Sequence, residues 1–222
     1  MSFEIDRRQL LRLGFAAAAA WQLQPWSVHA NATTVGLGPL SSVDVDTTLE
    51  AFADTLIPGQ KRSPADRAVA GAVRGPGAVQ AGALALMQFP PLGLGPGLPA
   101  LAAAVNAQAT SYAAAQRIAL DPSVPPFVSL DFRQRTRLAV QLLDFSHPDY
   151  LAYYALAALA FLAFHTAGHL HTADAVRQGH PGLKALGFPM PDHDGFWRFP
   201  QFSYRRRVAH SHGRTTRTGH PA

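Results

Sequence analysis

The amino-acid sequence predicts an all-α protein: a single helical bundle of about five helices, with long connections rich in proline and glycine and an irregular aromatic C-terminal strap. Apolar residues in the body of the chain recur at helical spacing, and no segment alternates apolar and polar residues over the length of a strand. The chain has 222 residues, 48% hydrophobic and 15% charged. That composition supplies enough apolar material for one core of ordinary size.

The clearest helix is expected over residues 47–57, where apolar residues recur three and four positions apart on one face. Thr47 and Glu50 have the spacing of a capping box at its start. Pro58 and Gly59 follow at its end, where they stop a helix.

Three further helices are expected in the middle of the chain. A second apolar stripe leads from Pro76, in a first helical turn, to Phe89. After the proline- and glycine-rich connection that follows, an alanine-rich helix is expected over residues 101–120. Asp131 is a plausible N-cap for a helix that runs through Leu143.

The fifth helix is the most hydrophobic segment of the chain. It follows His147 and Pro148, and residues 150–164 contain no charged side chain. A helix of this length rises about 22 Å, which is short of the hydrocarbon core of a bilayer at roughly 30 Å. We therefore predict a helix buried in the middle of the bundle.

The N-terminal residues 1–32 have the layout of an export signal. Paired arginines and a leucine pair precede nine uncharged residues dominated by alanine, and small-residue steps suited to cleavage follow. This arrangement resembles a twin-arginine signal, which exports folded proteins. Residues 33–43 are then a linker to the helical domain with its strap, 44–204. The residues assigned to the signal are Arg7, Arg8, Ala30 and Ala32.

The net charge of +5 belongs to the two ends of the chain. Residues 33–204 hold 11 Lys and Arg against 12 Asp and Glu, whereas residues 205–222 hold five Arg and no acid. No basic face is expected on the folded part, so a nucleic-acid partner is not expected. The basic tail 205–222 is expected to be disordered, and one alternative function is a cell-surface binding module that uses it.

Several classes of chemistry lack their motifs. The chain has no cysteine, which excludes disulfides, thiolate metal sites and cysteine nucleophiles. It also lacks a dinucleotide-binding glycine motif, a phosphate-binding P-loop and a serine nucleophile elbow. No catalytic, cofactor-binding or metal-binding residue is therefore assigned.

A histidine cluster leaves one enzymatic alternative open. His165 and His169 are four residues apart, so on one helix they could share a metal. His171 and Asp174 would face nearly the opposite side unless the helix breaks near Gly168. The alternatives are a secreted metal-dependent enzyme that uses His165 and His169, or histidines that line the polar end of the helix.

The segment 188–204 carries six aromatic residues among prolines and glycines. So many aromatic side chains need a surface to cover them, and the surface is either the chain's own bundle or a partner subunit. The candidate partner-contacting residues are Phe196, Trp197, Arg198, Phe199, Phe202 and Tyr204.

Residues 49–59, Leu-Glu-Ala-Phe-Ala-Asp-Thr-Leu-Ile-Pro-Gly, lie behind the twin-arginine-like leader. They are followed by Ser63-Pro64 and by Gly75-Pro76-Gly77-Ala78-Val79. This pattern resembles the gluconate 2-dehydrogenase subunit 3 family. The segments 169–172 and 196–200 are similar to an uncharacterised actinobacterial branch of that family.

The resemblance implies a small helical accessory subunit without a cofactor of its own. Its partner would be a flavin-dependent catalytic subunit of the glucose–methanol–choline oxidoreductase type, which holds FAD and is exported as a folded complex. The expected function is thus that of an exported, non-catalytic, chaperone-like subunit that stabilises and escorts the flavoenzyme. Its expected location is extracellular, cell-surface or periplasmic, with transient membrane contact through the signal.

Overall fold

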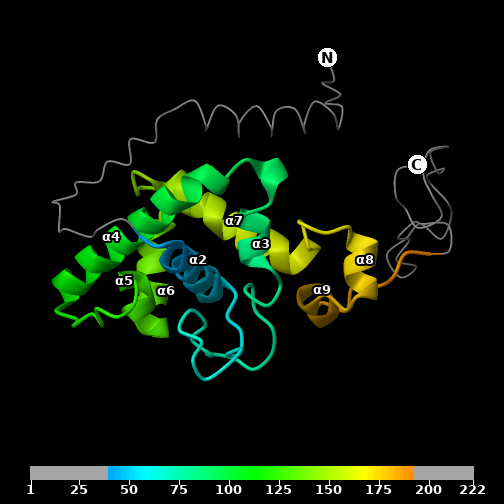
Figure 1. The fold of residues 1–222 in the computed structure, drawn as a ribbon, viewed down its shortest axis with the longest axis horizontal. Helices are drawn as coiled ribbons and strands as arrows, with labels where there is room; N and C mark the ends of the chain where they lie inside the picture. The colour runs from blue at the N-terminus through cyan, green and yellow to red at the C-terminus, as the bar shows by residue number, and fades with distance from the viewer. Residues whose placement is uncertain (1–39, 193–222) are drawn as a thin grey trace, which may run out of the picture.

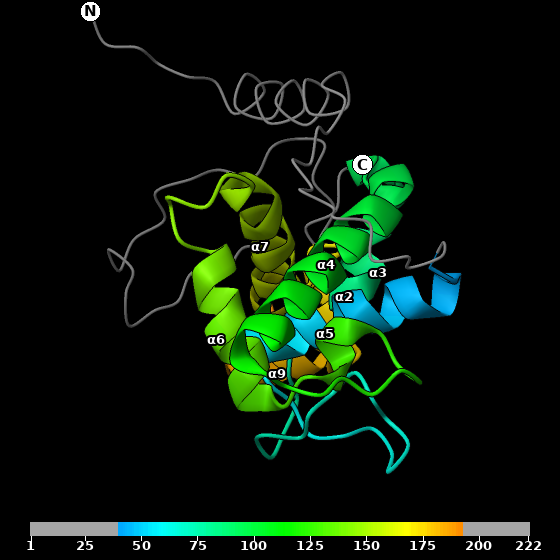
Figure 2. The same cartoon turned by 90° about the vertical axis from the view of Figure 1, so that its left-hand side faces the viewer.

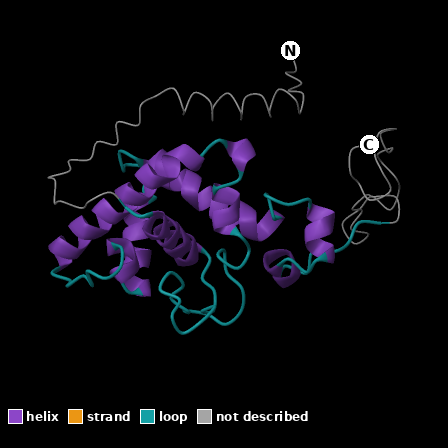
Figure 3. Cartoon of the chain, in the orientation of Figure 1, coloured by secondary structure: helices purple, strands orange, loops and turns teal. Residues whose placement is uncertain are grey.

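The computed structural model describes residues 40–192, which form eight α-helices and two short 3-10 helices and contain no strand (Figures 1 and 3). This arrangement confirms the predicted all-α fold. The elements are α2 (Ser42–Leu56), α3 (Ala83–Met87), η1 (Pro90–Leu92), η2 (Gly95–Gly97), α4 (Leu98–Gln116), α5 (Pro126–Ser129), α6 (Phe132–Leu142), α7 (Tyr150–Thr166), α8 (Thr172–Arg177) and α9 (Pro181–Ala185).

Four of the described helices, α2, α4, α6 and α7, are longer than ten residues, against about five predicted. The helix expected between Pro76 and Phe89 is reduced to α3. Gly82, the N-cap of α3, has a φ of 82°, so the turns before it cannot continue into α3 as one helix. The N-cap predicted at Asp131 is confirmed, and Gln134 completes a capping box with it.

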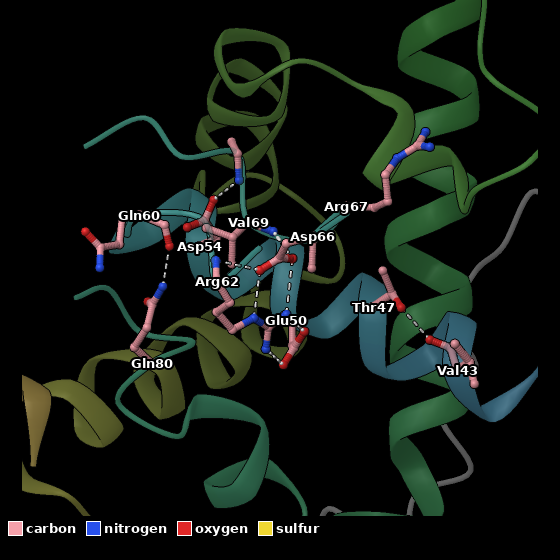
Figure 4. Close-up of polar contacts among 12 residues, drawn as sticks. Val43, Thr47, Glu50, Asp54, Gln60, Arg62, Asp66, Arg67, Val69 and Gln80 are labelled. Carbon is pink, nitrogen blue, oxygen red and sulfur yellow. Dashed lines mark hydrogen bonds and ion pairs between the residues drawn. The ribbon is translucent and has the colours of Figure 1, made fainter. Parts of the chain in front are cut away.

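Helix α2 begins earlier than predicted, two residues inside the expected linker. Ser41 is its N-cap and forms a capping box with Asp44. The capping box predicted at Thr47 and Glu50 is therefore wrong, because both residues lie in the body of the helix. Thr47 donates its hydroxyl to a carbonyl one turn back, as Figure 4 shows.

The core forms around α2, which contacts α3, α4, α5, α6 and α7 (Figures 1 and 2). Leu49 and Phe52 of α2 are completely buried, and the Phe52 ring lies 5.9 Å from the ring of Phe127. On the α4 side, the buried amide of Asn106 donates to Thr48 and accepts from the Phe127 backbone amide. These contacts place α2 in the centre of the bundle.

The long loop after α2 is held by the buried carboxylate of Asp54 (Figure 4). Its two oxygens accept hydrogen bonds from the backbone amides of Gly59, at 3.0 Å, and Ala70, at 2.9 Å. Burial raises the pKa of Asp54 above its ordinary value of 3.8, while the two amides favour the ionised form. One side chain thus anchors both ends of a loop that returns to the helix.

A second acidic residue, Asp66, organises the middle of the same loop. The guanidinium of Arg62 bridges Asp66 and Glu50, at 2.7 Å and 2.6 Å, and Asp66 also accepts from the amide of Val69 (Figure 4). Burial raises the pKa of Asp66, but the hydrogen bonds from Arg62 and Val69 outweigh it, so the pKa lies below 3.8.

This lowered pKa predicts a pH dependence of stability. The folded chain binds the Asp66 proton less tightly than the unfolded chain, so the contribution of the ionised group is present near neutral pH and is lost as pH falls through its folded pKa. The gap in unfolding free energy between the wild type and Asp66→Asn should be constant above about pH 5 and narrow below about pH 4. Denaturant titrations at several pH values measure it, and a gap that stays constant throughout would contradict the assignment.

Arg135 of α6 ties the loop to the bundle from the other side. Its side chain is 3% exposed and donates to the backbone carbonyls of Leu130, Ala68 and Val128 at 2.9, 2.7 and 2.6 Å. Burial lowers the pKa of Arg135, and the charge of Asp54 acts in the opposite direction. The four hydrogen-bond acceptors of the guanidinium are all backbone carbonyls, and none of them is a carboxylate.

Helices α8 and α9 form a small second cluster at the C-terminal end of α7 (Figure 1). Ala167, Ala175 and Leu183 are buried there, with Phe188 packed against them. Helix α9 approaches the end of α7 so closely that a Cβ on Gly182 would lie 2.1 Å from the carbonyl oxygen of Phe164.

Candidate interaction surface

Helix α7 carries apolar side chains all around its circumference and has no Asp, Glu, Lys or Arg. One face packs against α2 and α3, and its C-terminal end packs against α9. A helix that is apolar on every side is typically enclosed by other elements. The residues on its buried face are Ala152, Tyr153, Leu156, Ala157, Leu159, Ala160 and Ala163.

The opposite face of α7 is open to solvent. Leu151 is 62% exposed and Tyr154 is 53% exposed, and Phe161 and Leu162 are each 47% exposed. The prediction that this helix is buried in the middle of the bundle is therefore only half correct. We call this face the α7 seam, and its members are Leu151, Tyr154, Ala155, Ala158, Phe161, Leu162 and His165.

Ring contacts extend the seam past the start of the helix. The ring of Phe145, which is 86% exposed, lies 4.7 Å from that of Tyr150, which lies 5.5 Å from that of Tyr154. At the other end, the rings of Phe161 and His165 stack at 5.8 Å. The apolar surface thus extends from the loop before α7 to its last turn.

Beneath the seam, the buried ring of Tyr153 fixes the inner side of α7. Its pKa is raised to about 12 by burial and by the negative charge of Asp149. The ring of His147 packs edge-on against it at 5.2 Å. Tyr153 therefore stays a neutral phenol at physiological pH and acts in packing.

None of the helices in residues 40–192 is both long and apolar enough to cross a membrane.

The histidines singled out in the sequence do not share one helix. His165 lies on α7, with its Nδ1 2.9 Å from the carbonyl oxygen of Phe161. The helix ends before Ala167, which has a φ of 51°, so His169 lies in the turn that follows and His171 is the N-cap of α8. Helix α7 thus breaks at Ala167, one residue before Gly168, near which the sequence analysis allowed a break.

Within this turn, His169 packs against Gly82, just before α3. Its ring atoms lie 2.7 Å from where a Cβ on Gly82 would stand, and its ring centre lies 6.3 Å from that of His180. His180 in turn contacts the carbonyl of Ala81 at 3.0 Å through Nε2. Burial and the neighbouring His180 lower the pKa of His169. Among the described side chains, no three His, Cys, Asp or Glu lie close enough together to hold a metal ion.

An open hollow of about 360 Å³ lies between α4 and α6. It is shallow and mixes aliphatic, hydroxyl and amide groups with one guanidinium, so it has no paired acid and base for catalysis. Its lining residues are Tyr112, Gln116, Thr136, Arg137, Val140 and Gln141.

The other predicted site residues lie outside the described residues. These are the signal residues Arg7, Arg8, Ala30 and Ala32, and the strap residues Phe196, Trp197, Arg198, Phe199, Phe202 and Tyr204. The α7 seam was missed as an interface because its apolar residues fit an enclosed helix equally well. The sequence does not mark the exposed face, because apolar residues recur at steps of three and four on every face of α7.

Comparisons with known proteins add one finding. No curated protein and no solved structure matches the chain. One family model, described as a family of unknown function (DUF5987), matches residues 44–222, which include all of α4 to α9 and the whole α7 seam. Because the match covers most of the chain, the protein belongs to the DUF5987 family.

Proposed function

We propose that this chain is a non-catalytic accessory subunit that binds a larger protein through the α7 seam. The observation that supports the proposal is the mismatch between the composition of α7 and its surroundings. The helix has the apolar circumference of an enclosed element, yet Leu151, Tyr154, Phe161 and Leu162 are about half exposed or more. A partner surface would complete the enclosure.

The size of the seam agrees with a binding role. Covering a large apolar side chain that is about half exposed contributes on the order of 1 kcal/mol, and Leu151, Tyr154, Phe161 and Leu162 are such side chains. Association costs an estimated 4–15 kcal/mol in lost translational and rotational freedom. The seam therefore supplies part of what a stable complex requires, and contacts beyond it, such as those of Phe145, are needed for high affinity.

The identity of the partner follows from the resemblance of residues 49–59 and of the leader. We propose a glucose–methanol–choline type flavin oxidoreductase, with FAD held in that partner and export of the two chains together. In the described part, Asp54 of this segment holds the loop after α2 through backbone amides. In this proposal, residues 49–59 belong to the part of the fold against which α7 packs.

Co-expression tests this function. The full chain, tagged at its C-terminus, is produced together with a glucose–methanol–choline type oxidoreductase of the same cell and purified through the tag. We expect a complex with flavin absorbance that releases FAD on denaturation, and a lower yield of soluble flavoprotein when the chain is omitted. A colourless chain recovered alone would contradict the proposal, and so would turnover of substrate by the isolated chain.

A further inference from the structure

We propose that the junction between the α8–α9 cluster and the turn before α3 is a pH-sensitive switch, closed by two neutral imidazole rings, His169 and His180, and opened when His169 takes up a proton. The α8–α9 cluster comprises helices α8 and α9 with the small buried group at the end of α7. The inference goes beyond the accessory function and does not depend on it, because it concerns how this part of the fold responds to pH.

The α8–α9 cluster contacts the rest of the fold at the end of α7 and at the turn before α3 (Figure 1). At the turn, imidazole rings make the contacts. His180 lies 3.0 Å from the carbonyl oxygen of Ala81 through Nε2. The Cε1–Nε2 edge of His169 lies 2.7 Å from where a Cβ on Gly82 would stand. Because the buried residues of the cluster form a group separate from the main core, these ring contacts help to hold it in place.

His180, the N-cap of α9, uses both ring nitrogens in its neutral form. Nδ1 accepts a hydrogen bond from the backbone amide of Leu183 at 3.3 Å, so the ring proton lies on Nε2, which donates to the Ala81 carbonyl. A ring with a proton on each nitrogen would set an N–H of Nδ1 against the N–H of Leu183. The contacts of His180 are therefore those of a neutral ring.

His169 has less to gain from a proton where it lies. Its ring centre is 6.3 Å from that of His180, and its Nδ1 is buried without a hydrogen-bond partner among the described residues. A charged imidazole carries a proton on each nitrogen, so protonation would bury an N–H that has no acceptor. Burial, and then the neighbouring His180, lower the pKa of His169.

The other charged groups of this region do not favour the charged form of His169. Residues 78–88, which form the turn and α3, contain no titratable side chain. The one carboxylate on the neighbouring helices, Asp174, is paired with Arg177 and lies 3.7 Å from His171. Within the described part, no carboxylate contacts His169. The titratable groups of the neighbouring elements, besides His180, are His165 of α7, His171, Asp174 and Arg177 of α8, and Lys184 of α9.

Proton linkage gives the direction of the effect. The closed junction binds the His169 proton less tightly than an open one, so the cluster keeps its full stability above about pH 6.5, the ordinary imidazole value, and loses stability as pH falls below it. Helices α8 and α9 have only six and five residues and share a small buried group. They are therefore the part of the fold that we expect to open first, uncovering Leu183 and Phe188.

Hydrogen exchange of the full chain at about pH 7.5 and about pH 5.5 tests the switch. Protection factors, which correct for the intrinsic pH dependence of exchange, are read at the amides of Ala175, His180 and Lys184 and in the middle of α4. We expect the first three to fall at least about threefold at the lower pH, while those of α4 stay constant. Protection in the cluster that does not change with pH, or an equal loss in α4, would overturn the inference.

Three variants assign the effect to one ring. His169→Gln removes the titrating group and keeps a polar side chain, whereas His165→Gln and His171→Gln are matched controls on the same segment. We expect His169→Gln to keep its protection at pH 5.5 and both controls to lose it as the wild type does. An acid loss that persists in His169→Gln, or that disappears in either control, would place the switch elsewhere and overturn the inference.

A titration of the wild type decides the question even if His169→Gln does not pack normally. The Cε1–H resonance of His169, identified by its absence from the spectrum of that variant, is followed by NMR between about pH 8 and pH 5. We expect it to titrate below the ordinary value of 6.5. A midpoint at or above that value would show that the closed junction accepts the proton, which would overturn the inference.

Discussion

Replacing Arg135 by leucine is expected to lower the free energy of unfolding by about 3–5 kcal/mol. The guanidinium is 3% exposed and donates to four backbone carbonyls, two on the loop after α2 and two at the junction of α5 and α6. Leucine fills part of the volume but leaves those carbonyls without donors in a buried site. Denaturant unfolding followed by circular dichroism measures the loss.

Two variants make the Arg135 result interpretable. Arg133→Leu removes an exposed arginine from the same helix and should change stability by no more than about 0.5 kcal/mol. Arg135→Lys keeps the charge but has fewer donors, so its loss should be intermediate, and it provides a measurable value if the leucine variant does not fold. A leucine variant as stable as the Arg133→Leu control would show that the carbonyls find other donors.

The sequence alone predicted the long helices because their determinants are local. The stripe over residues 47–57, the Asp131 cap and the uncharged segment 150–164 all correspond to helices of the structure. Helix starts were less predictable, since Ser41 with Asp44 and Thr47 with Glu50 have the same capping spacing. In the structure Ser41 and Asp44 form the capping box, whereas Thr47 donates to the Val43 carbonyl and Glu50 pairs with Arg62.

The face that α7 exposes could not be predicted from its sequence. An amphipathic helix shows which side meets the core, but α7 is apolar all around and has almost no such asymmetry. Its orientation is set by tertiary contacts, with α3 on the inner face and α9 at the C-terminal end. The same lack of asymmetry made complete burial the natural expectation.

The residues that hold the loop after α2 also escaped prediction. Asp54 and Arg135 bind backbone amides and carbonyls, which every residue possesses, so no side-chain motif marks their partners. One sequence signal existed for Arg135. It precedes Leu138 and Leu142 at helical spacing and so lies on the apolar stripe of α6, where a charged residue needs buried partners.

Replacing Asp54 by asparagine is expected to cost about 2–4 kcal/mol of unfolding free energy. Both carboxylate oxygens accept backbone amides, from Gly59 and Ala70, and the side chain is fully buried. Asparagine has one oxygen, so its NH₂ group must face one of the two amides, donor against donor. The isosteric change leaves packing intact, so the loss reports the two hydrogen bonds together with the charge that acts on Arg135.

The matched control is Asp46→Asn, on the same helix. Asp46 accepts one hydrogen bond, from the side-chain amide of Gln88 at 2.8 Å at the surface, and asparagine can still accept it. That variant should stay within about 0.5 kcal/mol of the wild type.

Hydrogen exchange adds a local readout, because the amides of Gly59 and Ala70 should lose protection in Asp54→Asn more than amides in the middle of α4. Equal protection of those amides in both variants would show that the loop does not depend on Asp54, and that the segment of residues 49–59 holds its shape by other contacts.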